Sequence, residues 1–114
     1  RRADDPLLDD VAALAGERGL PILHHIWQWR RRDWPMQEAS DGEELGRLAA
    51  RHPRTRFILA HIGGGGEWAH TYHAVADLPN VWLDLSGSGI DRGMLDAALA
   101  AVGAARLLWA CDVT

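Results

Sequence analysis

The sequence predicts an α/β fold in which parallel strands alternate with helices. Short apolar runs are separated by stretches with helical periodicity, so the expected order is α-β-α-β-α-β-α-β along one domain spanning residues 1–114. Parallel strands cannot be joined by tight hairpins and need crossover connections of this kind. The apolar runs are nearly continuous, as in strands that are covered on both faces. The repeat of roughly 25–35 residues has the length of one βα unit.

The first predicted helix runs from about Pro6 to Arg18. Leu7, Val11 and Leu14 recur along it at helical spacing. Proline is tolerated in the first turn of a helix, and Gly19 can terminate this one. We therefore expect the chain to enter the sheet from a short amphipathic helix.

The remaining elements follow from the same kinds of pattern. Ser40 and Glu43 have the S-x-x-E spacing of a capping box, which predicts that the second helix begins there. Its buried face should hold Leu45, Leu48 and Ala49. In chain order the predicted strands are Pro21–His25, Arg56–His61, Asn80–Leu85 and Arg106–Cys111, and the other helices are Glu67–Ala76 and the stretch between Asp91 and Gly103.

Composition narrows the classes of function. The chain has 114 residues, of which 47% are hydrophobic, as in one globular domain. A net charge of −4 gives no reason to expect nucleic acid or an anionic membrane as partner, and no apolar run approaches the ~18 residues of a membrane span. All 12 basic residues are arginine, which excludes a Schiff-base or carbamylated lysine within this segment. The single Cys111 excludes an internal disulfide, and we expect a cytoplasmic location.

Polar side chains stand where each predicted strand ends. His24 and His25 end the first strand, His61 ends the second, Asp84 to Ser88 follow the third, and Asp112 follows the fourth. The C-terminal ends of parallel strands meet at one edge, where ligands bind in α/β proteins. Imidazole and carboxylate groups suit zinc, iron or manganese, and such sites leave room for an activated water. We therefore predict a site for one divalent metal ion.

Strand alternation separates the two adjacent histidines. His25 aligns with Leu23, which leaves His24 on the opposite face. We predict that His25 is the metal ligand and that His24 packs against a helix or forms a hydrogen bond behind the site. The same alternation assigns His61 to the face of Leu59.

Four motifs at these strand ends carry a resemblance to a known family: PILHH, FILAHIGGGG, NVWLDLSGS and LLWACDVT. In order and spacing they resemble the amidohydrolase superfamily, and more narrowly the amidohydrolase-related family. That family includes aminocarboxymuconate-semialdehyde decarboxylase, resorcylate-type decarboxylases and lactonases. The resemblance implies a (β/α)8 barrel, of which this chain would supply the C-terminal half, about strands 5 to 8. The family's H-x-H pair at strand 1 and its strand-4 residue are not in this sequence, so we expect a fragment that is inactive alone.

The resemblance also implies roles for three residues. His25 corresponds to a metal ligand, and His61 to a catalytic residue beside the metal-bound water and the substrate. Asp112 corresponds to an acid that binds or orients the metal water and acts as general base, although Ala110-Cys111 departs from the family's small residues. The implied cofactor is one divalent ion, zinc first and manganese or iron otherwise. The implied activity is hydrolysis of C–O or C–N bonds or a non-oxidative decarboxylation, and the motifs do not separate the two.

A substrate pocket is expected at the same edge, for a small molecule such as a carboxylate or a lactone. Gly63 to Gly66 let the backbone turn sharply without a side chain over the metal. The loop tryptophans, which include Trp34, either wall this pocket or pack over a helix end. The predicted pocket residues are Trp27, Trp29, Gly63, Gly64 and Ser86.

Several other features have a plainer interpretation. Arg30 to Arg32 could clamp a substrate carboxylate, but a solvated loop is favoured. His70 and His73 lie one helical turn apart without an acid at matching spacing, which favours a surface helix over a metal pair. Asp84 either supports the site or bonds a neighbouring loop amide. Cys111 is expected to be a buried, inert thiol.

Two functions of other classes remain as alternatives. One is a non-catalytic half-barrel that only associates with partners, since unpaired edge strands favour self-association. We expect a homo-oligomer in the full-length protein as well. The other is a doubly wound nucleotide-binding domain. Its G-x-G-x-x-G fingerprint fails because Trp68 takes the place of the third glycine, so no nucleotide cofactor is predicted.

Overall fold

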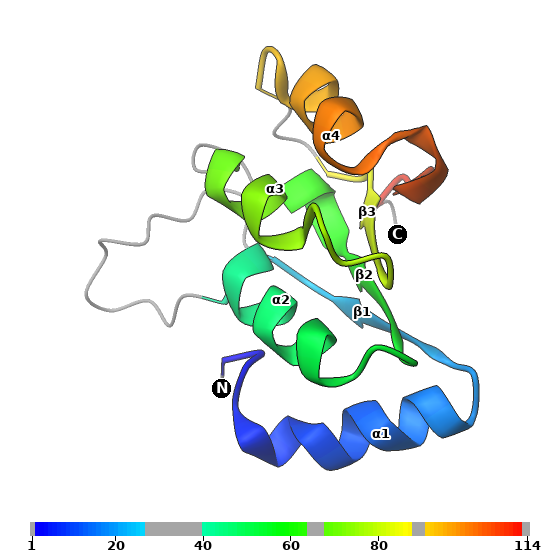
Figure 1. Ribbon diagram of the computed structural model, residues 1–114. Helices are drawn as coiled ribbons and strands as arrows, with labels where there is room; N and C mark the ends of the chain where they lie inside the picture. The colour runs from blue at the N-terminus through cyan, green and yellow to red at the C-terminus, as the bar shows by residue number, and fades with distance from the viewer. Residues whose placement is uncertain (1, 27–39, 64–67, 88–90, 113–114) are drawn as a thin grey trace.

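The computed structural model describes residues 2–26, 40–63, 68–87 and 91–112, and the predicted α/β order is confirmed (Figure 1). One parallel sheet has the strand order β1-β2-β3-β4. Its strands are β1 (Pro21–His24), β2 (Arg56–Leu59), β3 (Val81–Asp84) and β4 (Leu107–Leu108). The helices are α1 (Asp9–Glu17), α2 (Gly42–Arg51), α3 (Ala69–Val75) and α4 (Met94–Val102), with short 3-10 turns η1 (Pro6–Leu8), η2 (Ala60–Gly63) and η3 (Ala104–Arg106). Within the described ranges no helix is both long and apolar enough to cross a membrane.

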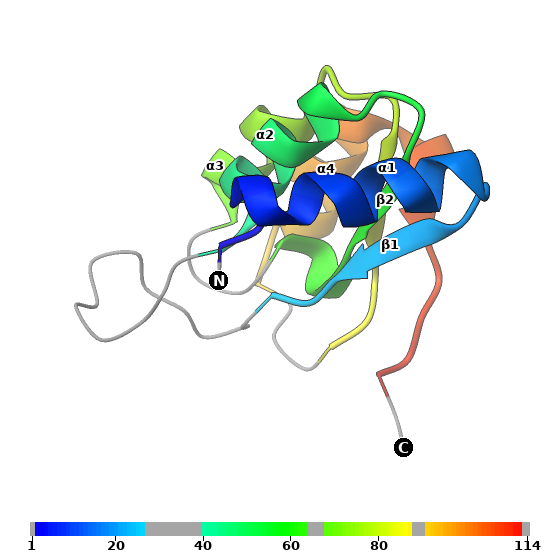
Figure 2. The same cartoon turned by 90° about the horizontal axis from the view of Figure 1, so that it is seen from below.

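One face of the sheet forms the hydrophobic core. The register pairs Phe57 with Val81 and Leu59 with Leu83, and all four side chains are fully buried. The helices lie together on this side of the strands (Figure 2). Burial of these side chains against the helices supplies the main stabilising contribution to the fold.

The opposite face of the sheet is open in the described part of the chain. Leu23 pairs with Ile58, which pairs with Trp82 on the next strand. Leu23 is 59% exposed, and the other two side chains are half-buried. The expectation that both faces are covered is therefore wrong for the described residues. Their apolar runs fit two covered faces, but the helices that they form lie on one side only.

Helix α1 turns its own apolar residues outward. Ala12 is fully buried, and its carbonyl accepts a hydrogen bond from the Thr55 hydroxyl at 2.8 Å. In contrast, Leu7, Val11 and Leu14 are 66%, 57% and 49% exposed. The periodicity predicts the apolar stripe correctly, but this stripe faces away from the core that the described residues form.

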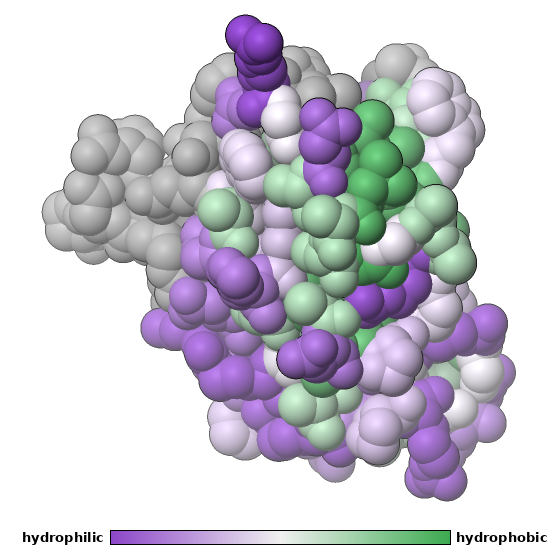
Figure 3. Space-filling model, turned by 45° about the horizontal axis from the view of Figure 1, so that its top comes forward, coloured by the Kyte–Doolittle hydropathy of each residue, from purple (hydrophilic) through white to green (hydrophobic). Residues whose placement is uncertain are grey.

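Small residues set the spacing of the other helices. A Cβ added to Gly46 of α2 would lie 2.9 Å from the carbonyl oxygen of Ala74, so the two helices approach closely there. Between α3 and α4 a groove of about 450 Å³ runs past Trp68, Tyr72 and His73 and is otherwise lined by alanines. Apolar surface gathers around α4 on this side of the molecule (Figure 3).

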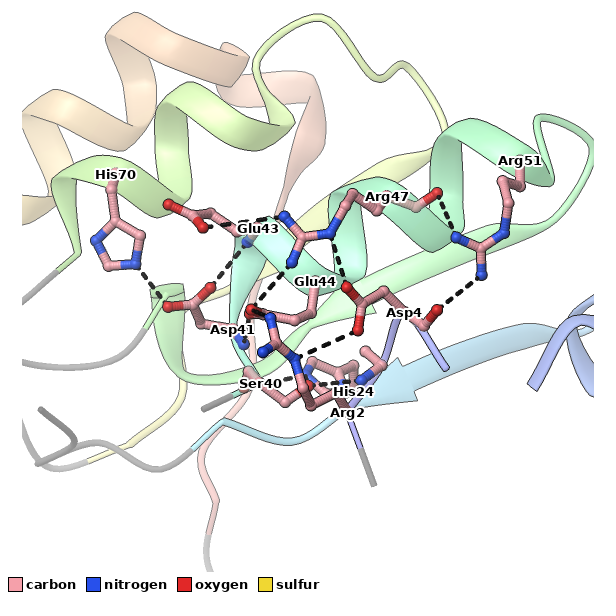
Figure 4. Close-up of polar contacts among 11 residues, drawn as sticks. Arg2, Asp4, His24, Ser40, Asp41, Glu43, Glu44, Arg47, Arg51 and His70 are labelled. Atoms are coloured by element: carbon pink, nitrogen blue, oxygen red, sulfur yellow. Dashed lines mark hydrogen bonds and ion pairs between the residues drawn. The ribbon is translucent and has the colours of Figure 1, made fainter. Parts of the chain in front are cut away.

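Helix α2 begins one residue later than predicted. Its N-cap is Asp41, which accepts a hydrogen bond from the Glu43 N–H at 2.9 Å, while Glu44 accepts one from the Asp41 N–H at 3.0 Å. The predicted Ser40–Glu43 box is therefore wrong by one position. The hydroxyl of Ser40 instead accepts a hydrogen bond from the Ala3 N–H at 2.9 Å. Figure 4 shows the carboxylates of this helix start surrounded by basic side chains. Those side chains are Arg2, Arg47 and His70.

Two side chains tie down the loops at the N-terminal end of the sheet. The Asn80 amide donates to the carbonyl groups of Ala49, His52 and Thr55 at 3.0–3.1 Å. The Arg106 guanidinium donates to those of Ala76 and Leu78 at 2.6 and 2.7 Å. These bonds satisfy carbonyl groups that a helix end leaves unpaired. The polar groups at this end thus stabilise the fold, and the candidate site lies at the other end of the strands.

Candidate functional site

The candidate site begins where β2 ends. After Leu59 the chain enters η2, in which His61 has φ 62°, ψ 33° and Ile62 has φ 49°, ψ 31°. Two consecutive left-handed residues with a Cβ are uncommon, and the second is β-branched. Their conformation is held by the His61 N–H, which donates to Asp84 Oδ1 at 3.0 Å, and by the Ile62 carbonyl, which accepts from the Tyr72 hydroxyl at 2.8 Å. Burial and the nearby charge of Asp91 raise the pKa of Tyr72, so this phenol keeps its proton.

This turn overrides the strand alternation on which the position of His61 was predicted. Leu59 faces the helices, and regular alternation would carry His61 to that same face. The assignment to the face of Leu59 assumed a strand that continues to His61, whereas the left-handed residues end it two positions earlier. The His61 ring instead meets the ring of His25, with 4.8 Å between centroids and 85° between planes.

Residues from all four strand ends come together around His61. Its Nδ1 lies 3.0 Å from the hydroxyl oxygen of Ser86 and 3.9 Å from Oδ2 of Asp112. His25 follows β1, Ser86 follows β3 and Asp112 follows β4. The structure therefore brings His25, His61, Ser86 and Asp112, all predicted from the sequence, to one edge of the sheet.

The members of this cluster differ in exposure. His61 and Ser86 are each 5% exposed, and Asp84 is 4% exposed. The side chain of Asp112 is 54% exposed, and its backbone is left-handed with φ 53°. At 3.9 Å and with this exposure, an ion pair between Asp112 and His61 would be weak. Asp112 is thus near the imidazole without being tied to it.

The segment after β4 differs from prediction. Cys111 is exposed, and Trp109 is 82% exposed. The expectation of a buried thiol is wrong because β4 has only two residues, Leu107 and Leu108, and the chain then leaves the sheet. A longer fourth strand, as predicted, would have kept the thiol beside the other strands.

His24 lies on the helix-facing side of β1, in register with Leu59. Its Nε2 is 3.4 Å from both the carbonyl oxygen and the hydroxyl of Ser40 at the start of α2. Burial lowers the pKa of His24, and the contact with the Ser40 carbonyl only partly offsets this. The ring is therefore neutral near pH 7, and it packs against a helix start as the alternation predicted.

The other histidines have structural contacts. His70 Nε2 lies 2.6 Å from Oδ2 of Asp41, so α3 is joined to the N-cap of α2, while His73 is exposed and borders the α3–α4 groove. His52 Nε2 lies 2.6 Å from Oδ1 of Asp9 on α1. The groove between α3 and α4 is not part of the site, because its lining residues come from the two helices and the residue before α3.

Comparison with known proteins decides the family. The family model "Amidohydrolase" (Amidohydro_2) matches residues 1–113. The chain belongs to the amidohydrolase family. No curated protein matches the sequence.

Solved structures show the fold to which this amidohydrolase chain corresponds. It superposes on an amidohydrolase from Burkholderia multivorans with bound zinc (TM-score 0.73, 22% identity, 96% of this chain and 43% of that one). It also superposes on an uncharacterized Tim-barrel protein from Bordetella bronchiseptica (0.71, 18%, 97% and 39%) and on a 2,6-dihydroxybenzoate decarboxylase complexed with 2,6-dihydroxybenzoate (0.61, 17%, 97% and 45%). The chain thus spans less than half the length of these proteins, and its sheet is part of a (β/α)8 barrel.

The donor set of this amidohydrolase chain fits a divalent metal in kind but not in number. His25 and Asp112 offer an imidazole and a carboxylate, the ligand types that zinc and iron take. Within residues 2–26, 40–63, 68–87 and 91–112, however, no three His, Cys, Asp or Glu side chains converge closely enough to hold an ion. Nδ1 of His61 already contacts Ser86. Any ion at this edge would need further ligands beyond the described residues.

Sequence reasoning placed Ser86 in the substrate pocket and left the role of Asp84 open. In the structure Asp84 Oδ1 accepts from the backbone N–H of both His61 and Ser86, and the Ser86 hydroxyl also bonds it. The D-x-S spacing at the end of β3 is typical of such an Asx turn and was the available signal. The predicted pocket residues Trp27, Trp29 and Gly64, together with Trp34, Arg30 to Arg32 and the rest of the glycine run, lie outside the described residues.

Proposed function

We propose that this chain supplies part of the active site of a metal-dependent amidohydrolase-family enzyme, in which His25, His61 and Asp112 act together. The observation that carries the proposal is the meeting of their side chains: the two rings are 4.8 Å apart, and Asp112 Oδ2 is 3.9 Å from His61 Nδ1. The family match supports it, and the zinc in the Burkholderia multivorans structure supports a divalent ion.

In the proposed site each residue has one task. His25 would hold one divalent ion, zinc or else manganese or iron, through a ring nitrogen. Asp112 would bind beside it and accept a proton during the reaction, a task that its exposed carboxylate can serve. His61 would donate or accept a proton at the substrate, since its buried ring is held firmly at the edge. A bound divalent ion would polarise the substrate and make hydroxide available near neutral pH.

The reaction would be hydrolysis of a C–O or C–N bond or a non-oxidative decarboxylation of a small carboxylate or lactone. Both reactions need a polarised oxygen and a proton held at a defined position, and these three side chains supply the proton-transfer groups for either. The remaining ligands and the substrate walls would come from outside the described residues. We place the protein in the cytoplasm and expect the full-length enzyme to be a homo-oligomer.

One feature favours an enzyme over a non-catalytic association module. His61 and Ile62 are both in the left-handed region, at a cost of about 1–3 kcal/mol each. A module that served only for association would gain nothing from a strained turn that buries an imidazole beside a second one. Strain of this kind concentrates at functional sites.

The test uses the full polypeptide that carries this sequence. We expect it to bind close to one equivalent of divalent metal, to lose turnover on chelation, and to recover turnover when the metal is restored. Asp112→Asn should lower kcat by about 100-fold or more, as expected for loss of a general base. Asp96→Asn, which changes an exposed acid on α4, is the matched control and should leave kcat unchanged. A full-length protein that binds no metal, or an Asp112→Asn variant with full turnover, would contradict the proposal.

A further inference from the structure

We infer that Ser86 and Asp84 are positioning residues that keep the imidazole of His61 hydrogenated at Nδ1 and leave Nε2 as its only free nitrogen. Three contacts carry the inference. Asp84 Oδ1 accepts from the N–H of His61 at 3.0 Å and from that of Ser86 at 2.9 Å, and it also bonds the Ser86 hydroxyl. That hydroxyl oxygen lies 3.0 Å from His61 Nδ1. The consequence for catalysis rests on the proposed function, but the tautomer does not.

Counting donors fixes the direction of each bond. A backbone N–H can only donate, so Oδ1 of Asp84 is already the acceptor in two bonds and carries no hydrogen of its own. The hydrogen between Oδ1 and the Ser86 hydroxyl therefore comes from the serine. A serine hydroxyl has one hydrogen, and once that hydrogen points to Asp84 the oxygen can only accept. The hydrogen between this oxygen and His61 must then belong to Nδ1.

Burial keeps this order of bonds in place. Asp84, Ser86 and His61 are each 5% exposed or less, so water has little access to compete for any of the three groups. A hydrogen-bonded chain is stronger in such surroundings than in water, and a broken bond is more costly. The backbone N–H of His61 is part of the same network, so one carboxylate orients both the main chain and the side chain of this residue.

Asp112 does not take the place of Ser86. Its Oδ2 lies 3.9 Å from Nδ1, beyond hydrogen-bond distance. Its negative charge near Nδ1 favours a hydrogen on that nitrogen, which is the arrangement that Ser86 requires. Both neighbours thus act on the same side of the ring. His61 can then exchange a proton with a substrate, or approach a metal ion, only through Nε2.

The tautomer can be read directly by nuclear magnetic resonance on the 114-residue chain with ¹⁵N-labelled histidine and without metal. We expect the neutral His61 ring to show its one-bond N–H correlation at Nδ1, with Nε2 lacking a hydrogen. The His61→Gln variant assigns the signal, because it removes that correlation alone. A wild-type ring with the hydrogen on Nε2 and none on Nδ1 would overturn the inference whatever the variants do.

Substitutions at Ser86 test the cause. Ser86→Ala should abolish the slowly exchanging Nδ1–H signal, and Ser86→Thr, which restores a hydroxyl, should recover it. Ser40→Ala is the matched control, since Ser40 also lies beside a histidine, at 3.4 Å from His24, and should leave the His61 signal in place. An unchanged signal in Ser86→Ala would overturn the positioning role. If that variant does not fold, the wild-type and Ser86→Thr spectra still decide.

The two proposals fail in different measurements. If the full-length protein binds no metal, the proposed function is wrong, yet the Nδ1–H signal of the metal-free chain still supports the positioning of His61. If the signal lies at Nε2, the positioning is wrong, and metal binding through His25 and Asp112 is untouched.

Discussion

His61 and Ile62 hold backbone conformations that residues with a Cβ rarely adopt, and each neighbour that secures them belongs to a different element. Tyr72 of α3 bonds the Ile62 carbonyl, and Asp84 at the end of β3 bonds the His61 N–H. The Ile62 side chain is 2% exposed, so its burial offsets part of the backbone strain. The imidazole is therefore oriented before any ligand arrives, which is the condition for efficient proton transfer.

A second residue-scale feature is the carboxylate of Asp9, which joins α1 to the end of α2. Hydrogen bonds from His52 and then from Arg51 lower the pKa of Asp9 below its ordinary value of 3.8. A carboxylate whose pKa is lower in the folded state stabilises the fold above its unfolded pKa, and this contribution is lost as pH falls through the folded value.

We therefore predict that the free energy of unfolding decreases as pH falls below about 3.8 and that Asp9→Asn reduces this decrease. Urea unfolding of the chain at a series of pH values measures it. Asp10→Asn, at the neighbouring position of the same helix, is the control and should keep the wild-type dependence. Equal slopes for wild type and Asp9→Asn below pH 3.8 would contradict the prediction.

At the scale of the element, the start of α2 shows how tertiary contacts choose between two local solutions. The segment Ser40-Asp41-Gly42-Glu43-Glu44 contains two overlapping capping boxes, one beginning at Ser40 and one at Asp41. Both satisfy the local rule. The second is adopted because Glu44 is fully buried beside Arg2 and Arg47, and because Asp41 meets His70 from α3 (Figure 4).

Asp41→Ala should therefore lower the free energy of unfolding by about 1–2 kcal/mol, the upper part of the range for loss of an N-cap. Ser40→Ala should cost less, about 0.5–1 kcal/mol, because it removes a single side-chain hydrogen bond to the backbone. Denaturant midpoints at equal slope measure both. A larger loss from Ser40→Ala than from Asp41→Ala would restore the cap that the sequence alone suggested.

At the scale of the whole molecule, apolar surface remains uncovered on the side of α1 and β1. Leu7, Val11 and Leu14 project from α1, and Leu23 is exposed on β1, whose outer edge has no partner strand among the described residues. An unpaired edge next to apolar side chains favours association with another chain.

We predict that the 114-residue chain self-associates as its concentration rises, and that Leu14→Glu weakens this association. Burial of that leucine contributes about 1.5–3 kcal/mol, so a charge in its place should raise the dissociation constant by 10-fold or more. Ala13→Glu adds the same charge at an exposed position outside the stripe and is the control. Analytical ultracentrifugation reports both. A wild-type chain that sediments at 12.6 kDa at every concentration would contradict the prediction.

The order of elements and the edge that holds the site were predictable because each depends on local patterns. Apolar runs mark strands, and the polar residue after each run marks its C-terminal end. Three details were not predictable from such patterns. The left-handed turn at His61 depends on contacts with Tyr72 and Asp84 from other elements. The exposure of Cys111 follows from a fourth strand of only two residues. Periodicity in α1 identifies an apolar stripe but not what covers it.

The open face of the sheet has a consequence for how such an enzyme would diversify. Leu23, Ile58 and Trp82 lie in register on the side that no described helix covers. On the proposed function, this side forms one wall of the reaction chamber, and a separate stretch of polypeptide builds the opposite wall. Proton-transfer groups and selectivity would then reside in different pieces of chain. Exchanging the opposing piece would alter which molecules enter without disturbing the acid–base group.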